Sequence, residues 1–266
     1  MDTTNRFVAY WLGYANGEHH SAQKHPLRDT PEYIDYVNLF LIHLNPQTTL
    51  NHDFIVTGGI SWEQIMEDAR LLQARGQKVL ASIMSTDSYF WNSIDNPREF
   101  AQKAVDLVVG QWGLDGIDID PEMGNNTIKP KESFIEVVGA LREALDSEKL
   151  LTFVSFKLGF DTEVLQRNVP LLDYVSLMGY FWGTKTYKEE FQKYSKIVPK
   201  DKLLIGVNPY YDQQTPLEEV KELCRWQSGQ GGGGMMLFCT PCDIEVYSGH
   251  PEWAYRQTIR DCLKTS

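Results

Sequence analysis

Short apolar runs alternate with longer segments of helical periodicity along most of the chain. The runs are rich in Val, Ile, Leu and Phe, which is typical of strands buried on both faces, as in a parallel sheet. Eight such strands are predicted, at Phe7–Trp11, Tyr36–His43, Lys78–Met84, Leu114–Asp120, Leu151–Phe156, Tyr174–Met178, Leu203–Asn208 and Met235–Cys239.

The segments between the runs carry helix signals. Helices are predicted at Ser61–Arg75, Pro97–Trp112, Pro130–Asp146, Thr215–Gln227 and Glu252–Leu263, with weaker patterns at Thr162–Asn168 and Tyr187–Val198. Ser61 is a candidate N-cap, Pro97 suits a first helical position, and Thr215 opens a near capping box. The run Gly231–Gly234 lacks the lysine of a phosphate loop and is interpreted as a link between helix and strand.

Eight strands alternating with helices in about 250 residues predict one (β/α)8 TIM barrel of class α/β over residues 1–266. A doubly wound sheet is the alternative, but no G-x-G-x-x-G follows the first strand. In a barrel, catalytic residues lie at the carboxyl ends of the strands.

The composition excludes some classes of binding partner. The net charge of −11 argues against nucleic acid, because phosphate binding needs a basic surface. No apolar run approaches the ~18 residues of a membrane span, so no membrane partner is expected. The N-terminus carries no recognisable signal peptide, so we expect a cytoplasmic protein or a secreted one without its leader.

Four cysteines lie near the C-terminus: Cys224, Cys239, Cys242 and Cys262. Cys239 and Cys242 form a C-x-x-C, which could indicate zinc or redox chemistry. A second pair of zinc ligands is missing, and the motif follows a late strand rather than opening an early helix. Free thiols or one local disulfide are therefore predicted, with no metal site.

The fourth predicted strand carries the candidate chemistry. Because side chains alternate along a strand, Asp118, Asp120 and Glu122 share one face, while Ile117 and Ile119 share the other. The isoleucines require burial against helices, so the acids should point into the barrel. Close carboxylates cannot all ionise at neutral pH, and such a cluster is a setting for a general acid. A metal site or a structural hydrogen-bond cluster are the alternatives.

The run Asp115-x-x-Asp118-x-Asp120-x-Glu122 resembles the D-x-x-D-x-D-x-E signature of glycoside hydrolase family 18, also on the fourth of eight strands. The resemblance implies that Glu122 protonates the glycosidic oxygen while the substrate's own 2-acetamido carbonyl attacks the anomeric carbon. It further implies that Asp120 orients the acetamido group, that Asp118 shares a proton with Asp120, and that configuration is retained. No cofactor is expected.

Other strand ends resemble the same family. Met178 and Tyr180 match its Met-x-Tyr, in which the Tyr would bind the acetamido carbonyl; for Met178, core packing is an equal alternative. Tyr10 and Trp11 match its opening Tyr-Trp, with core packing again an equal alternative for Tyr10. Ser82 matches the serine that supports the carboxylates, although it could equally be a small core residue.

Two departures bear on the substrate. Family chitinases carry Asp after the strand-six Tyr and Trp on strand eight, where this chain has Phe181 and Phe238. The segments Tyr180–Thr184 and Val37–Phe40 are closer to endo-β-N-acetylglucosaminidases. We therefore expect a monomeric enzyme that binds an N-acetylglucosamine-containing glycan or glycoprotein and cleaves the chitobiose core of N-glycans. A chitinase and a non-catalytic, lectin-like barrel are the alternatives.

Aromatic residues are abundant near strand ends and could stack on sugars or fill the core. Glycan contact is predicted for Trp182, Tyr89 and Trp91, which lie in polar contexts, and Trp11 and Phe238 are further candidates. Asn208 could bind a sugar or cap the turn before Pro209.

Overall fold

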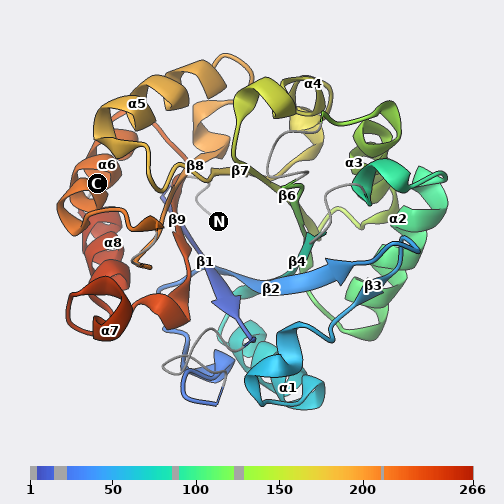
Figure 1. The fold of residues 1–266 in the computed structure, drawn as a ribbon, viewed down its shortest axis with the longest axis horizontal. Coiled ribbons are helices and arrows are strands. Elements are labelled where there is room, and N and C mark those ends of the chain that lie inside the picture. The colour runs from blue at the N-terminus through green and yellow to red at the C-terminus, as the bar shows by residue number, and fades with distance from the viewer. Residues whose placement is uncertain (1–4, 15–22, 86–89, 123–128, 211–212, 266) are drawn as a thin grey trace.

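The computed structural model describes residues 5–14, 23–85, 90–122, 129–210 and 213–265. These form a closed barrel of parallel strands surrounded by helices (Figure 1), in which β1 pairs with both β9 and β2. The barrel strands are β1 (Arg6–Leu12), β2 (Tyr36–Leu44), β4 (Lys78–Met84), β5 (Gly116–Asp120), β6 (Leu150–Ser155), β7 (Val175–Leu177), β8 (Leu203–Val207) and β9 (Gly234–Phe238). A short β3 (Leu50–Asn51) runs antiparallel to β2. The predicted TIM barrel is confirmed.

Helices cover the outside of the barrel (Figure 1). They are α1 (Trp62–Ala74), α2 (Pro97–Val105), α3 (Glu132–Ala144), α4 (Leu158–Asn168), α5 (Gly183–Tyr194), α6 (Leu217–Gly229), α7 (Glu245–Ser248) and α8 (Ala254–Lys264). Ser61 caps α1 by accepting the Gln64 N–H at 3.2 Å, as predicted, and Pro97 is the first residue of α2.

The predicted capping box at Thr215 is wrong. The N-cap of α6 is Pro216, which makes no side-chain cap. The Thr215 hydroxyl instead accepts the Asn208 N–H at 3.2 Å and donates to the Tyr180 carbonyl at 3.0 Å. It therefore ties the end of β8 to the segment after β7, beside the mouth of the barrel.

Alternation along the strands separates two cores. Residues such as Ile117 and Ile119 face outward and are fully buried between strands and helices. Residues such as Val8, Leu80 and Met236 fill the inside of the barrel. Because the outward side of β5 takes the isoleucines, its acids must face the interior.

The glycine run before the last strand allows close backbone contact. Gly234, the first residue of β9, has φ +133°, and a Cβ there would lie 2.1 Å from the Arg6 carbonyl oxygen of β1. The last glycine is thus part of the strand, where it lets β9 pair with β1. The rest of the run links α6 to it, as predicted.

The cysteines form two disulfides, Cys224–Cys262 and Cys239–Cys242. The local pair was one of the predicted alternatives, but the Cys224–Cys262 bond between α6 and α8 corrects the expectation of at most one disulfide. Among the described residues, no group of His, Cys, Asp and Glu is arranged to hold a metal ion.

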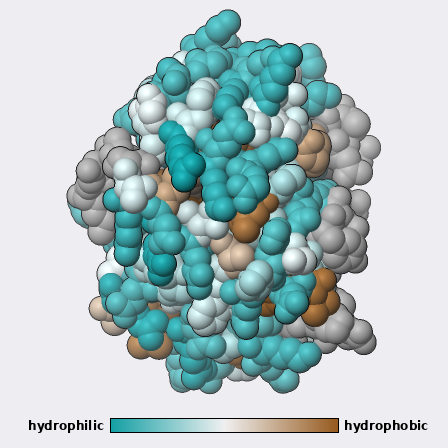
Figure 2. Space-filling view, turned by 90° about the vertical axis from the view of Figure 1, so that its left-hand side faces the viewer, coloured by the Kyte–Doolittle hydropathy of each residue, from teal (hydrophilic) through white to brown (hydrophobic). Residues whose placement is uncertain are grey.

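The face of the barrel that bears α5, α6 and α8 is mostly hydrophilic. Figure 2 shows the side that bears α5, α6 and α8, where apolar residues are scattered among polar ones. No helix in the described part of the chain combines the length and hydrophobicity needed to cross a bilayer.

Candidate active site

The acidic residues of β5 lie at the carboxyl end of the barrel interior. Asp118 and Asp120 are almost completely buried, and Glu122, two residues after the strand, is partly exposed at its mouth. The structure therefore brings the predicted row of carboxyl groups together on one face, with Glu122 nearest to solvent.

Asp118 is held by three hydroxyl donors. Its Oδ2 accepts the Tyr10 hydroxyl at 2.6 Å and the Ser82 hydroxyl at 2.9 Å, and its Oδ1 accepts the Thr152 hydroxyl at 2.6 Å. Burial raises the pKa of Asp118, and these hydrogen bonds oppose the rise. The arrangement suits a negative charge on Asp118.

The surroundings of Asp120 and Glu122 favour the protonated carboxyl form more than those of Asp118 do. Burial, followed by the charges of Glu122 and Asp118, raises the pKa of Asp120 well above its ordinary value. Burial also raises the pKa of Glu122. The Asp120 Oδ1 is buried and has no hydrogen-bond partner in the described structure. These shifts favour a protonated carboxyl group within the row, which general acid catalysis requires.

Asp115, the first acid of the signature, lies at the opposite end of the strand. Its Oδ2 accepts the Val79 N–H at 3.0 Å and the Gln73 amide at 2.8 Å, and Lys78 lies 3.3 Å from its Oδ1. It fixes the start of β5 against β4 and α1. Its role is structural.

An aromatic cluster forms one wall of the mouth. Tyr180 and Phe238 stack with ring centroids 5.9 Å apart, and Phe238 also packs against Tyr10 at 5.6 Å and Phe40 at 5.3 Å. Burial, then the charges of Asp120 and Glu122, raises the pKa of Tyr180 well above its ordinary value, so its hydroxyl stays protonated. Tyr180 is thus a hydrogen-bond donor beside the carboxyl groups.

Close backbone contact brings Tyr180 to this position. A Cβ on Gly206 of β8 would lie 3.2 Å from the Tyr180 ring and 2.3 Å from the Leu177 carbonyl oxygen. Met178 is buried in the interior cluster that also contains Tyr180. This position is compatible with both roles considered for Met178, core packing and sugar contact.

Trp11 lies away from the carboxyl row, which corrects its prediction as a sugar contact. It is only 1% exposed and packs in the outer core, and its indole N–H donates to the His25 carbonyl at 2.9 Å. Tyr10 is its neighbour on the interior side. Of this pair, Tyr10 and not Trp11 contacts the carboxyl row. The alternation of β1 alone does not show which of its faces points inward.

Three further residues were predicted as sugar-binding candidates, and the structure treats each of them differently. Trp91 is fully buried against Phe100 and Phe134, so the prediction of glycan contact for it is wrong. Asn208 Oδ1 accepts the Tyr210 N–H at 2.8 Å, which is the turn-capping alternative. Tyr89 lies outside the described residues.

Trp182 is partly exposed and packs on Tyr187 with ring centroids 5.3 Å apart. It lies beyond Tyr180 at the start of α5 and is accessible to a ligand.

Thr152 was missed by sequence reasoning, since a single threonine inside an apolar strand carries no signal until its position opposite Asp118 is known.

The chain resembles known glycosidases. A family model described as the endo-beta-N-acetylglucosaminidase EndoS TIM-barrel domain matches residues 9–237. Chitinase 1 of Tulipa saxatilis subsp. bakeri is 28% identical over 126 residues, which is 45% of this chain and 37% of that protein's length.

Solved structures share the fold at low identity. Catalytic domain 2 of the group II chitinase from Ostrinia furnacalis superposes with a TM-score of 0.80 at 15% identity, covering 98% of this chain and 97% of that domain. A mutant of that domain was solved in complex with a chito-oligosaccharide described as (NAG)5. A fungal endo-beta-N-acetylglucosaminidase of glycosyl hydrolase family 18 has a TM-score of 0.76 at 14% identity, covering 98% of this chain and 99% of that one.

Proposed function

Because this chain belongs to glycoside hydrolase family 18, within the group defined by the EndoS TIM-barrel domain, we propose that it hydrolyses the β-1,4 bond in the chitobiose core of N-glycans. The observation that carries the proposal is Glu122, which ends the buried carboxyl row at the barrel mouth with a raised pKa. The matching family is named for an endo-β-N-acetylglucosaminidase, which favours the N-glycan over other N-acetylglucosamine substrates.

In this proposal the bond breaks by proton transfer and internal attack. Glu122 donates its proton to the glycosidic oxygen, so that the leaving sugar departs as an alcohol. The carbonyl oxygen of the substrate's 2-acetamido group attacks the anomeric carbon from the opposite face and forms a cyclic oxazolinium ion. The Glu122 carboxylate then takes a proton from water, which opens the ring with net retention.

The residues around Glu122 support the acetamido group. The Asp120 carboxyl accepts its N–H, and the protonated hydroxyl of Tyr180 donates to its carbonyl oxygen. Asp118, saturated by three hydroxyl donors, keeps its negative charge and stabilises the positive charge that develops on the ring. Phe238 offers the sugar an aromatic face at the mouth, where strand β9 ends.

Chitin oligomers are a second candidate substrate. The tulip relative is named a chitinase, and a neighbouring structure contains a chito-oligosaccharide. Both substrates place an N-acetylglucosamine unit before the scissile bond, so the same carboxyl row would serve either. Phe181 and Phe238 differ from the residues of family chitinases, which is why we prefer the N-glycan.

The test is product analysis by mass spectrometry of a high-mannose glycoprotein and of chitin oligomers, each incubated with the wild type and with Glu122→Gln. We expect the glycoprotein to retain one N-acetylglucosamine, and Glu122→Gln to lose at least 100-fold in rate, the smaller effect typical of a general acid. Cleavage of chitin oligomers alone would move the proposal to chitinase. Unchanged activity in Glu122→Gln would refute the assignment of the acid.

A further inference from the structure

A groove lies on the outside of the barrel between α4 and α5, apart from the carboxyl row. Its volume is about 540 Å³, and its walls include Phe156, Thr162, Trp182, Thr186, Glu190 and Lys193. The two helices make only sparse contact in the described structure, whereas α2 packs closely on α3 and α6 on α8. The groove results from this gap.

Aromatic rings connect the groove to the active site. Phe156 follows β6 on the interior side and packs against the barrel-interior cluster, and it also lines the groove. Its ring centroid lies 5.7 Å from that of Phe181, which is 51% exposed and directly follows Tyr180. Trp182, the next residue, forms part of the groove wall. A ligand that leaves the mouth beside Tyr180 therefore meets three rings in succession.

The lining suits a neutral sugar. Pyranose rings present apolar C–H faces to aromatic side chains and hydroxyl groups to polar ones, and ligand sites usually combine apolar walls with a few polar groups. Thr162 and Thr186 supply hydroxyls at the groove. Glu190 and Lys193 neutralise each other in an ion pair of 2.5 Å. Among the described residues, the lining therefore carries a single uncompensated charge, that of Lys157, whose Nζ lies over the Phe160 ring at 5.0 Å.

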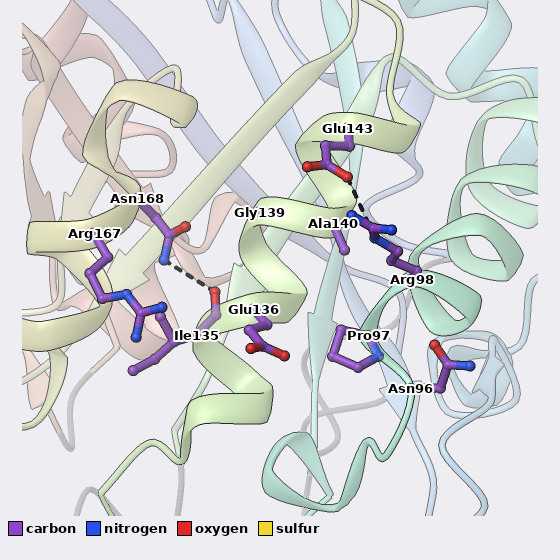
Figure 3. A pocket seen from close by; sticks show the side chains of 10 residues that line it. All are labelled: Asn96, Pro97, Arg98, Ile135, Glu136, Gly139, Ala140, Glu143, Arg167 and Asn168. Carbon is purple, nitrogen blue, oxygen red and sulfur yellow. Dashed lines mark hydrogen bonds and ion pairs between the residues drawn. The ribbon is translucent and has the colours of Figure 1, made fainter.

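A second groove of similar size lacks this chemistry. It lies between α2, α3 and α4, has a volume of about 550 Å³, and contains no aromatic ring (Figure 3). Arg98, Glu143, Glu136 and Arg167 line it, and Arg98 and Glu143 form an ion pair across it. It is a matched control surface on the same barrel.

A buried hydrogen-bond network holds the walls of the α4–α5 groove in place. The Ser155 hydroxyl donates to Asp161 on α4 at 2.5 Å and lies 2.6 Å from the Tyr194 hydroxyl on α5. Ser155 directly precedes Phe156. The strand end and both helices are thereby fixed relative to one another before any ligand binds.

We propose that the α4–α5 groove is a second glycan site, which binds a neutral hexose branch of the same N-glycan whose chitobiose core lies over Glu122. This inference rests on the proposed function. The occupant is a branch of the substrate because the three rings lead into the groove from the catalytic mouth.

The test is calorimetric binding in the Glu122→Gln background, with a released high-mannose glycan and with the same glycan trimmed to a single mannose on chitobiose. Trp182→Ala should weaken binding of the full glycan about tenfold and leave the affinity for the trimmed glycan unchanged. Because Trp182 also packs on Tyr187, a second variant is Thr186→Arg, which changes an exposed residue and fills the groove. It should have the same effect. Arg98→Ala in the second groove should have none.

The outcomes separate the inference from the proposed function. If Glu122→Gln binds the full glycan and neither groove variant weakens that binding, the groove does not hold a branch, whatever the wild type cleaves. If the variants weaken the trimmed glycan equally, the groove does not select branches and the inference fails. If Glu122→Gln binds neither glycan, both proposals are overturned. If the variants affect only the full glycan, the inference stands even where cleavage is not observed.

Discussion

At the scale of single residues, the site depends on hydroxyl donors that favour the ionised form of one carboxyl group in a row where burial raises every pKa. Asp118 receives hydroxyl donors from three different strands, whereas the Oδ1 of Asp120 has no hydrogen-bond partner in the described structure. Burial penalises the charge on all three acids. The donors therefore decide where the charge resides, and Glu122 can keep the proton that the proposed reaction uses.

Ser82→Ala should alter the pH dependence of the enzyme. Removing the Ser82 donor leaves Asp118 harder to ionise and raises its pKa, so the acid limb of kcat/KM should move to higher pH. A hydrogen bond to a charged group contributes about 1.5 kcal/mol, which corresponds to about one pH unit. The measurement is a pH profile of kcat/KM on the cleaved glycan.

Ser176→Ala is the control for that profile. Ser176 is a buried serine of β7 whose hydroxyl has no protein partner in the described structure. Its removal should leave the acid limb in place. An acid limb that is identical in wild type and Ser82→Ala would show that the hydroxyl does not tune the ionisation of Asp118.

Individual residues also show which parts of the site could be predicted from the sequence. The acids of β5 could be assigned to the barrel interior from the sequence, because they alternate with isoleucines that require burial on the other face. Trp11 could not be excluded without knowing which face of β1 points inward. Thr152 could not be found at all, because its contact with Asp118 depends on the register between β5 and β6.

At the scale of elements, strands were predicted more accurately than helices. The barrel strands are buried on both sides, so their apolar runs have clear limits. The helices α4 and α5 begin four residues before their predicted starts, because Gly159 and Gly183 are weak helix formers and obscure the first turn in the sequence. The Cys224–Cys262 bond was not predictable, since it depends on α6 packing against α8 in space.

The Asp161 network gives α4 and α5 a pH-dependent connection. Burial raises the pKa of Asp161 to about 7 from an ordinary value of 3.8, against the effect of the Ser155 hydroxyl. A folded pKa above the unfolded one means that this group's stabilisation is complete below pH 3.8 and is lost as pH rises to about 7. The loss is about 4 kcal/mol, taken as an order of magnitude.

Asp161→Asn should remove that pH dependence. The amide can still accept from Ser155 but does not ionise, so its stability should fall less than that of the wild type between pH 4 and 7. Chemical unfolding at several pH values measures the difference, which isolates Asp161 from other buried acids. Parallel stability curves for the two proteins would contradict the raised pKa.

At the scale of the whole molecule, the carboxyl row and the upper end of the α4–α5 groove lie at the same end of the barrel. The carboxyl row, the aromatic wall and the Phe156–Phe181 pair all lie where strands β5, β6, β7 and β9 end. The opposite end of β5 is used for structure, where Asp115 joins neighbouring elements. A long glycan could thus contact the mouth and the outer helices at once, which a cleft confined to the barrel interior would not allow.

The central claim is that an internal nucleophile, and not water, attacks the anomeric carbon first, so that the configuration is retained. It is tested most directly by time-resolved proton NMR of the newly formed reducing end. Attack from within the substrate, followed by water, predicts that the β-anomer appears first and then equilibrates to the mixture of anomers. Initial appearance of the α-anomer would mean a single displacement by water, and would contradict the mechanism proposed for Glu122, Asp120 and Tyr180.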